Sequence, residues 1–125
     1  MPTPIKIQVG GKELRGELND SASAKVVIEH LPLTVGLSRW GDEYYGNCGL
    51  TIKTDATARE LMEVGEIAIW PPGNALCLFF GPTPASTDAR PRAASPVNPV
   101  GRITENAAQL KALGPSVTAT LARLD

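Results

Sequence analysis

The strongest constraint on the fold is a continuous apolar segment, residues 75–80, which lies between two clusters of turn-forming residues. Pro71-Pro72-Gly73-Asn74 precedes this segment, and Gly81-Pro82-Thr83-Pro84 follows it. A short apolar run between turns predicts a strand that is covered on both faces, because either face would otherwise expose hydrophobic side chains to water. Such a strand belongs in the middle of a sandwich or in the wall of a barrel.

Alternation of apolar and polar residues predicts further strands on both sides of this one. An opening hairpin is expected at residues 5–9 and 14–18, because Gly10-Gly11 is a typical two-residue hairpin loop. Residues 59–64 are ambiguous between a helical turn and a strand, and their alternation favours the strand. The other expected strands are residues 33–40, 43–46, 66–70, 97–103 and 117–121.

Two short helices are also expected. The first follows Asp20 or Ser21, either of which can cap a helix, and it ends before Pro32. Its apolar stripe consists of Ala24, Val27, Ile28 and Leu31. The second follows Thr104 as its cap and ends at Gly114-Pro115. His30 is expected at the end of the first helix, bonded to a carbonyl group.

About eight mostly antiparallel strands and two short helices fit a closed eight-stranded β-barrel with the helices capping its ends. Closure removes the edge strands that an open wall of this size would expose. We expect residues 1–125 to form one domain, because a chain of 125 residues can bury a single core without disulfides or metals.

Composition excludes several classes of partner. The net charge is −1, with 12 basic and 13 acidic residues, and no basic stripe indicates nucleic acid. No stretch approaches the length of an apolar membrane span, and the first residues lack the apolar core of a signal peptide. We therefore expect a cytoplasmic protein with two free thiols, Cys48 and Cys77. Cys77 is expected to fill the core, and Cys48 lacks a basic neighbour that would make its thiol reactive.

Few residues are suited to catalysis or to metal binding. One histidine and two distant cysteines argue against a metal site, and no nucleotide-binding or nucleophile motif occurs, so no metal or cofactor is expected. Asp42 and Glu43 are expected to be solvated acids of a turn. Alternatively, Glu43 bonds Trp40 or Tyr45 and braces a pocket.

The expected order of elements resembles the cyclophilin fold, and several motifs resemble the small prokaryotic cyclophilin-like domain family more closely. These motifs are residues 70–86, Trp40-Gly41-Asp42-Glu43, Val64-Gly65-Glu66, Ser95-Pro96-Val97-Asn98 and Gly101-Arg102-Ile103. Most members of this family are uncharacterised. The resemblance therefore implies the barrel and leaves the activity open.

True cyclophilins rotate X-Pro peptide bonds by placing an arginine beside the proline nitrogen. Their motif, Phe-His-Arg followed by Phe-x-x-Gln-Gly-Gly-Asp, is missing from this chain. Its only glutamines, Gln8 and Gln109, lie near the two ends of the sequence. If the protein is a weak prolyl isomerase, Arg39 is the arginine to test, because it ends the third expected strand beside Trp40.

A binding site is the leading hypothesis, because several aromatic residues, including Trp70, lie at strand ends or beside Pro/Gly loops. We expect an apolar groove beside Phe80 that takes a small ligand or a proline-containing peptide. The expected ligand-binding residues are Trp40, Tyr45, Phe80, Thr83, Ser86, Asn98 and Arg102. Two alternatives remain. The aromatic rings fill the barrel while Thr83, Ser86 and Asn98 close turns, or loop 81–99 binds a partner protein.

Overall fold

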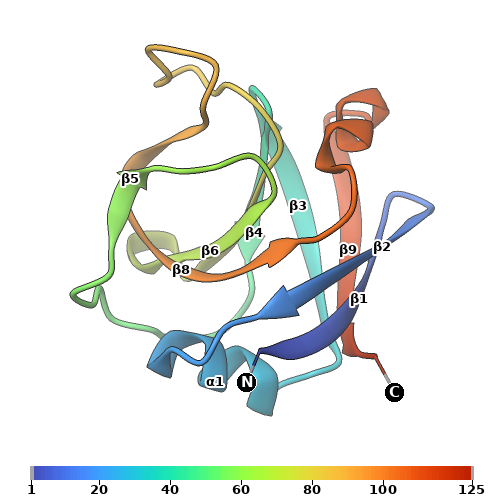
Figure 1. Cartoon of the computed structure of the whole chain (residues 1–125), viewed down its shortest axis with the longest axis vertical. Coiled ribbons are helices and arrows are strands. Elements are labelled where there is room, and N and C mark those ends of the chain that lie inside the picture. The colour runs from blue at the N-terminus through green and yellow to red at the C-terminus, as the bar shows by residue number, and fades with distance from the viewer. Residues whose placement is uncertain (1, 125) are drawn as a thin grey trace.

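The computed structural model describes residues 2–124 and consists mainly of β-strands (Figure 1). The strands are β1 Thr3–Val9, β2 Lys12–Leu18, β3 Leu33–Trp40, β4 Glu43–Asn47, β5 Arg59–Leu61, β6 Glu66–Trp70, β7 Ala75–Phe79, β8 Arg92–Ile103 and β9 Ser116–Arg123. The helices are α1 Ala22–Glu29 and two 3-10 helices, η1 Pro71–Gly73 and η2 Ala107–Ala112.

Eight of the strands form a closed ring in the order β2-β1-β9-β3-β4-β7-β6-β8, and β8 pairs with β2 to complete it. Neighbouring strands run antiparallel. The short β5 pairs with β8 and is not a member of the ring. The expected closed eight-stranded barrel is thus confirmed, with β5 as an additional strand.

The ring closes where β2 and β8 come unusually close. Leu18 of β2 is paired with Gly101 of β8. A methyl group on Gly101 would lie 2.2 Å from the carbonyl oxygen of Glu17, far inside van der Waals contact. Glycine is therefore required at this position for the two backbones to approach each other.

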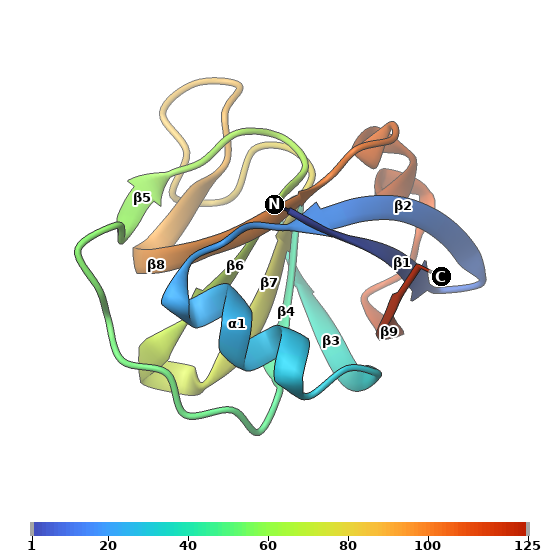
Figure 2. The ribbon, with the colours of Figure 1, turned by 60° about the horizontal axis from the view of Figure 1, so that its bottom comes forward.

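Helices α1 and η2 lie at opposite ends of the barrel, with α1 across one end (Figure 2) and η2 at the other (Figure 1). Ser21 caps α1 by accepting a hydrogen bond from the Ala24 N–H at 3.1 Å. At the other end of α1, Nδ1 of His30 lies 2.7 Å from the Val26 carbonyl oxygen, as expected.

Two sequence-based boundaries were wrong. The second helix is a 3-10 helix capped by Asn106, whereas Thr104 still donates a backbone hydrogen bond to Arg15 of β2 and so continues the barrel wall. In addition, β8 begins at Arg92 rather than at Val97. Its first half lacks clear alternation but finds a pairing partner in β5, a contact that the sequence pattern does not reveal.

The molecule has two hydrophobic cores. The larger fills the barrel and includes Leu76, Leu78 and Phe80. The smaller lies on the outer face of the wall, beneath β5 and the first half of β8, and it consists of Met62, Ala68, Cys77, Phe79, Ala93 and Val97, with Trp70 packed against it. Strand β7 is therefore covered on both faces, as its unbroken apolar sequence predicts.

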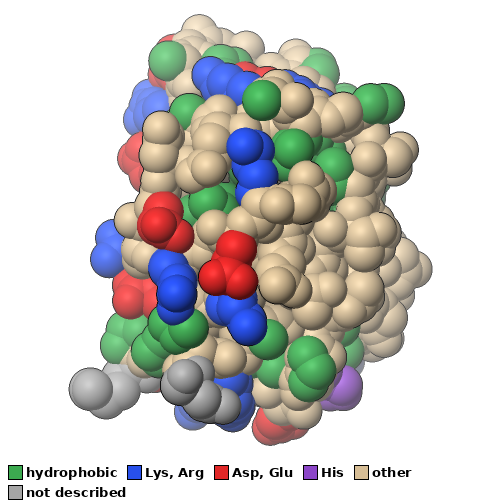
Figure 3. All heavy atoms as spheres, turned by 90° about the vertical axis from the view of Figure 1, so that its right-hand side faces the viewer, with side chains coloured by type: hydrophobic (Ala, Val, Ile, Leu, Met, Phe, Trp, Pro, Cys, Tyr) green, Lys and Arg blue, Asp and Glu red, His purple; other side chains and the backbone are tan. Residues whose placement is uncertain are grey.

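The face of the molecule that holds η2 and β9 has mixed charge. Figure 3 shows acidic and basic side chains interspersed there, with hydrophobic side chains scattered between them. Ion pairs such as Arg39–Asp42 and Lys111–Asp42 join neighbouring charges in this region. Within residues 2–124, no helix combines the length and hydropathy needed to cross a bilayer.

Candidate functional site

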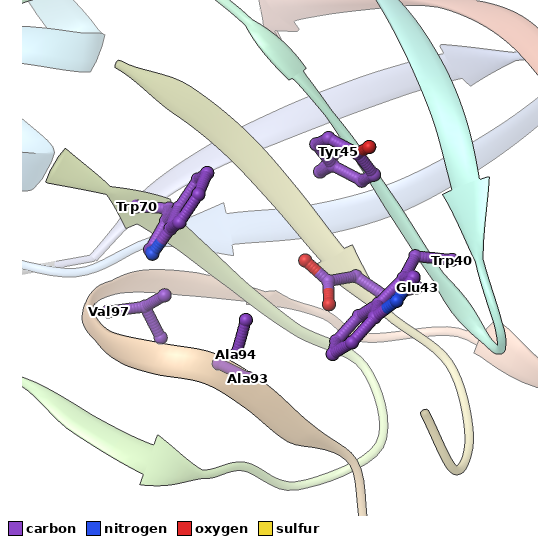
Figure 4. Close-up of a pocket in the computed structure, with 7 residues that line it drawn as sticks. All are labelled: Trp40, Glu43, Tyr45, Trp70, Ala93, Ala94 and Val97. Atoms are coloured by element: carbon purple, nitrogen blue, oxygen red, sulfur yellow. The ribbon is translucent and has the colours of Figure 1, made fainter. Parts of the chain in front are cut away.

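A pocket of about 240 Å³ lies on the outer face of the barrel, above the smaller core (Figure 4). Strands β3, β4 and β6 form one side of it, and the first half of β8 forms the other. The lining residues are Trp40, Glu43, Tyr45, Trp70, Ala93, Ala94 and Val97. Most of these side chains are apolar or aromatic, and a single carboxyl group lies among them.

Strand register explains why Trp40, Glu43 and Tyr45 share one face. Trp40 is the direct cross-strand partner of Glu43 in the β3–β4 hairpin. Directly paired residues point to the same side of a sheet, and so do residues two positions apart in one strand. Glu43 and Tyr45 are two positions apart, so the hairpin presents an indole, a carboxyl group and a phenol together on its outer face.

Trp70, at the end of β6, completes the aromatic lining. Its Nε1–H donates a hydrogen bond to Oγ of Ser95 in β8 at 2.6 Å. This bond joins the two sides of the pocket and satisfies the indole donor. The Trp70 ring is therefore held at the cavity, across from Trp40 and Glu43 (Figure 4).

Glu43 is the unusual polar residue of the site. Its side chain turns into the space between the rings of Trp40 and Trp70 (Figure 4), and the residue is only 5% exposed. Its Oε1 has no hydrogen-bond partner within residues 2–124. Burial raises the pKa of this carboxyl to about 7, partly offset by an interaction with the Cys77 thiol.

The neighbouring acid, Asp42, has quite different surroundings. Its carboxyl group accepts a hydrogen bond from Arg39 at 2.9 Å and lies 3.7 Å from the Lys111 ammonium group. Glu43 takes part in no such ion pair with any residue that the structure describes. The expectation that both acids are solvated turn residues is therefore wrong for Glu43.

Only two of the residues expected to bind a ligand line this pocket, namely Trp40 and Tyr45. Phe80 is 0% exposed and packs against Tyr44 inside the barrel, with 5.3 Å between the ring centroids. The groove expected beside Phe80 is thus not found there. Phe79, one residue earlier, faces the outer core instead, because successive residues of a strand point to opposite faces.

Thr83 and Ser86 are engaged within their own loop. The Thr83 N–H donates to Oγ of Ser86 at 2.9 Å, and that hydroxyl group donates in turn to the Arg90 carbonyl oxygen at 2.8 Å. The Thr83 hydroxyl group donates to the Arg92 carbonyl oxygen. These bonds agree with the alternative in which both residues close turns.

Asn98 is fully buried and connects three parts of the chain. Its Nδ2 donates to Oγ of Ser23 at 3.1 Å and to the Lys53 carbonyl oxygen at 2.8 Å. Its Oδ1 accepts from the Asp55 N–H at 3.2 Å. The side chain thus anchors α1 and the segment before β5 to β8, and it does not line the pocket.

The two arginines singled out from the sequence also lie outside the pocket. Arg102 is exposed and donates to Glu17 at 3.0 Å. The Arg39 guanidinium group lies 5.1 Å from the centroid of the Phe80 ring. Its nitrogens donate to the carbonyl oxygens of Gly41, Lys111 and Leu113 and to the carboxyl group of Asp42. All three nitrogens are therefore used to hold the end of the barrel together.

Sequence reasoning missed part of the pocket. The sequence pattern predicts Glu43 as a solvated turn acid or as a brace of a pocket, and Trp70 as a strand-end aromatic residue outside the set of ligand-binding residues. Ala93, Ala94 and Val97 carry no signal of binding in the sequence, because their place in the pocket depends on β8 folding back over the outer face. Within residues 2–124, no cluster of three or more His, Cys, Asp or Glu side chains is arranged to hold a metal ion.

A closed antiparallel barrel with two short helices at its ends and a pocket on its outer wall defines the class of this protein. Residues 3–121 match the family described as Cyclophilin-like, and the chain belongs to that family. It is also similar to the solution structure of the hypothetical protein AF2241 from Archaeoglobus fulgidus. The two are 31% identical with a TM-score of 0.78, over 98% of this chain and 95% of that one. No curated protein matches the chain.

Proposed function

We propose that this cyclophilin-like domain is a binding module and that the outer pocket takes a small organic ligand. The observation that carries the proposal is the combination of three aromatic side chains with one buried carboxyl oxygen that lacks a partner. Small-ligand sites are typically concave and apolar with a few polar groups that orient the ligand. A buried polar atom without a partner is costly, so such an atom at a pocket wall favours a ligand that satisfies it.

The other functions considered have less support. A prolyl isomerase of the cyclophilin type would need a guanidinium group free to approach a proline nitrogen, whereas every nitrogen of Arg39 donates to a neighbouring group. A partner-binding role for loop 81–99 is also weakened, because residues 92–99 belong to β8. A proline-containing peptide would have to fit a pocket of about 240 Å³, which suits a small molecule better.

The two tryptophans of the chain, Trp40 and Trp70, both line the pocket, so their indole N–H resonances report directly on binding. We expect some members of a library of small cationic and neutral compounds to shift both indole signals of the ¹⁵N-labelled protein. These compounds should also raise the melting temperature through preferential binding to the folded state.

A matched pair of variants locates the site. Tyr45→Ala removes a pocket ring that is 38% exposed, so it should weaken binding without unfolding the protein. His30→Ala changes a residue at the end of α1 and should leave binding unchanged. A library in which no compound shifts the indole signals, or binding that Tyr45→Ala leaves intact, would contradict the proposed function.

A further inference from the structure

Resting on the proposed function, we propose that the outer pocket selects small organic cations, namely alkylated or methylated amines, over neutral molecules of the same shape. Two independent features of the pocket wall favour such a ligand, namely the aromatic rings and the Glu43 carboxyl group.

The aromatic rings provide the first feature. Trp40, Tyr45 and Trp70 line a single cavity from three different strands. An ammonium group against an aromatic face is attracted by the negative face of the ring, most strongly for tryptophan, and the interaction grows as the cation is desolvated. Two tryptophans and a tyrosine around a cavity of about 240 Å³ therefore favour a compact cation with alkyl substituents.

The carboxyl group provides the second feature. Glu43 is 5% exposed, its Oε1 lacks a hydrogen-bond partner, and no described Lys, Arg or His side chain forms an ion pair with it. A buried carboxylate is stable only when a positive charge or hydrogen-bond donors compensate it. A bound ammonium ion would supply that charge, whereas an anion would be repelled and a neutral alkyl group would leave the carboxylate uncompensated.

Proton linkage gives the proposal a further observable. A cation binds better to ionised than to protonated Glu43, so its affinity should increase as the pH rises through about 7. The other titratable groups around Glu43 are Cys77 of β7, whose thiol pKa burial raises well above its usual value, and Tyr45 of β4. On β8, Nη1 of Arg92 lies 3.6 Å from Glu60 of β5, and Nε of Arg92 has no hydrogen-bond partner within residues 2–124.

The test compares choline with its uncharged carbon analogue, 3,3-dimethylbutan-1-ol, by titration of the two indole signals at pH 8. We expect choline to bind at least about tenfold more tightly, since cation–π contacts and a desolvated ion pair both favour it. Glu43→Gln keeps the size of the side chain but removes its charge, and should reduce this preference by about tenfold. Glu29→Gln, an exposed change on α1, should leave both affinities unchanged.

The outcomes separate this inference from the proposed function. Equal affinity of the two probes, or a preference that survives Glu43→Gln, would overturn selection of cations. So would a failure of choline to bind when neutral compounds shift the indole signals, although the pocket would then remain a ligand site. If no compound of either kind shifts the indole signals, the proposed function itself fails.

Discussion

At the scale of single residues, the Asp42 carboxyl group accepts a hydrogen bond from Arg39, whereas that of its neighbour Glu43 lies among indole rings. Adjacent acids in a turn are hard to tell apart in a sequence. Their environments differ because strand alternation sends Glu43 to the same face as its cross-strand partner Trp40. The sequence thus shows that acids and aromatic residues lie close together along the chain, but it does not show which acid is buried among the rings.

The first prediction concerns the pH dependence of stability. Burial raises the pKa of Glu43 from 4.5 to about 7, so between these values the folded protein binds more protons than the unfolded chain. Stability should therefore fall as the pH rises through this window and level off above it, by about 3 kcal/mol in total from this residue. Glu43→Gln should abolish this component and be the more stable protein at pH 8.

Urea denaturation of both proteins from pH 4.5 to pH 8.5 measures this difference. The relevant quantity is the unfolding free energy of the wild type minus that of Glu43→Gln, because the contributions of the other titrating groups to the pH dependence cancel in this difference. A difference that stays constant across the range would show that Glu43 does not carry the raised pKa.

At the scale of elements, β7 and β8 show what a sequence pattern can and cannot reveal. The apolar run of β7 correctly predicts a strand covered on both faces. It cannot indicate which face is which, since Phe79 and Phe80 are identical residues in adjacent positions, and Phe80, beside which the groove is expected, lies in the core of the barrel. The first half of β8 was missed because its partner, β5, is only three residues long and lies far away in the sequence.

The second prediction concerns the contact between η2 and the β3–β4 hairpin. Arg39 joins them through a planar guanidinium group that donates to several carbonyl oxygens and to Asp42. Arg39→Lys keeps the charge but cannot reproduce this set of bonds, so it should lower the unfolding free energy by about 2 kcal/mol. Arg102→Lys, at an exposed ion pair, should change it by less than about 0.5 kcal/mol.

Chemical denaturation of the two variants checks this comparison. Amide hydrogen exchange should also show the largest loss of protection in residues 107–113, where the Arg39 bonds end. Equal stability of the two lysine variants would mean that the Arg39 contacts contribute little to holding η2.

At the scale of the whole molecule, the closed ring was predictable because most of its strands alternate clearly and β7 needs cover on both sides. The family match over residues 3–121 agrees with that architecture. The pocket was not predictable to the same degree, since it forms where β8 bends away from the ring and covers the outer wall. Local patterns define strands, whereas the position of this pocket depends on the packing of the first half of β8 against the outer face of the wall.

The third prediction tests the contact that closes the ring. Gly101→Ala would place a methyl group against the backbone of Glu17, so β2 and β8 would have to separate. We expect a loss of at least about 3 kcal/mol of unfolding free energy, at the upper end of overpacking effects. Gly36→Ala is the matched control within β3, because a methyl group there meets no atom within 4 Å. Thermal and urea unfolding of both variants measure the difference, and similar stabilities would argue against a tight contact.

Ring closure also bears on how the protein behaves at high concentration. Among the described strands, each member of the ring has a partner on both sides, and only the three-residue β5 ends the sheet order. Polymerisation through backbone pairing starts from long exposed strand edges, which this architecture nearly eliminates. A protein built so largely of strands should consequently resist fibril formation for as long as the seam between β2 and β8 holds.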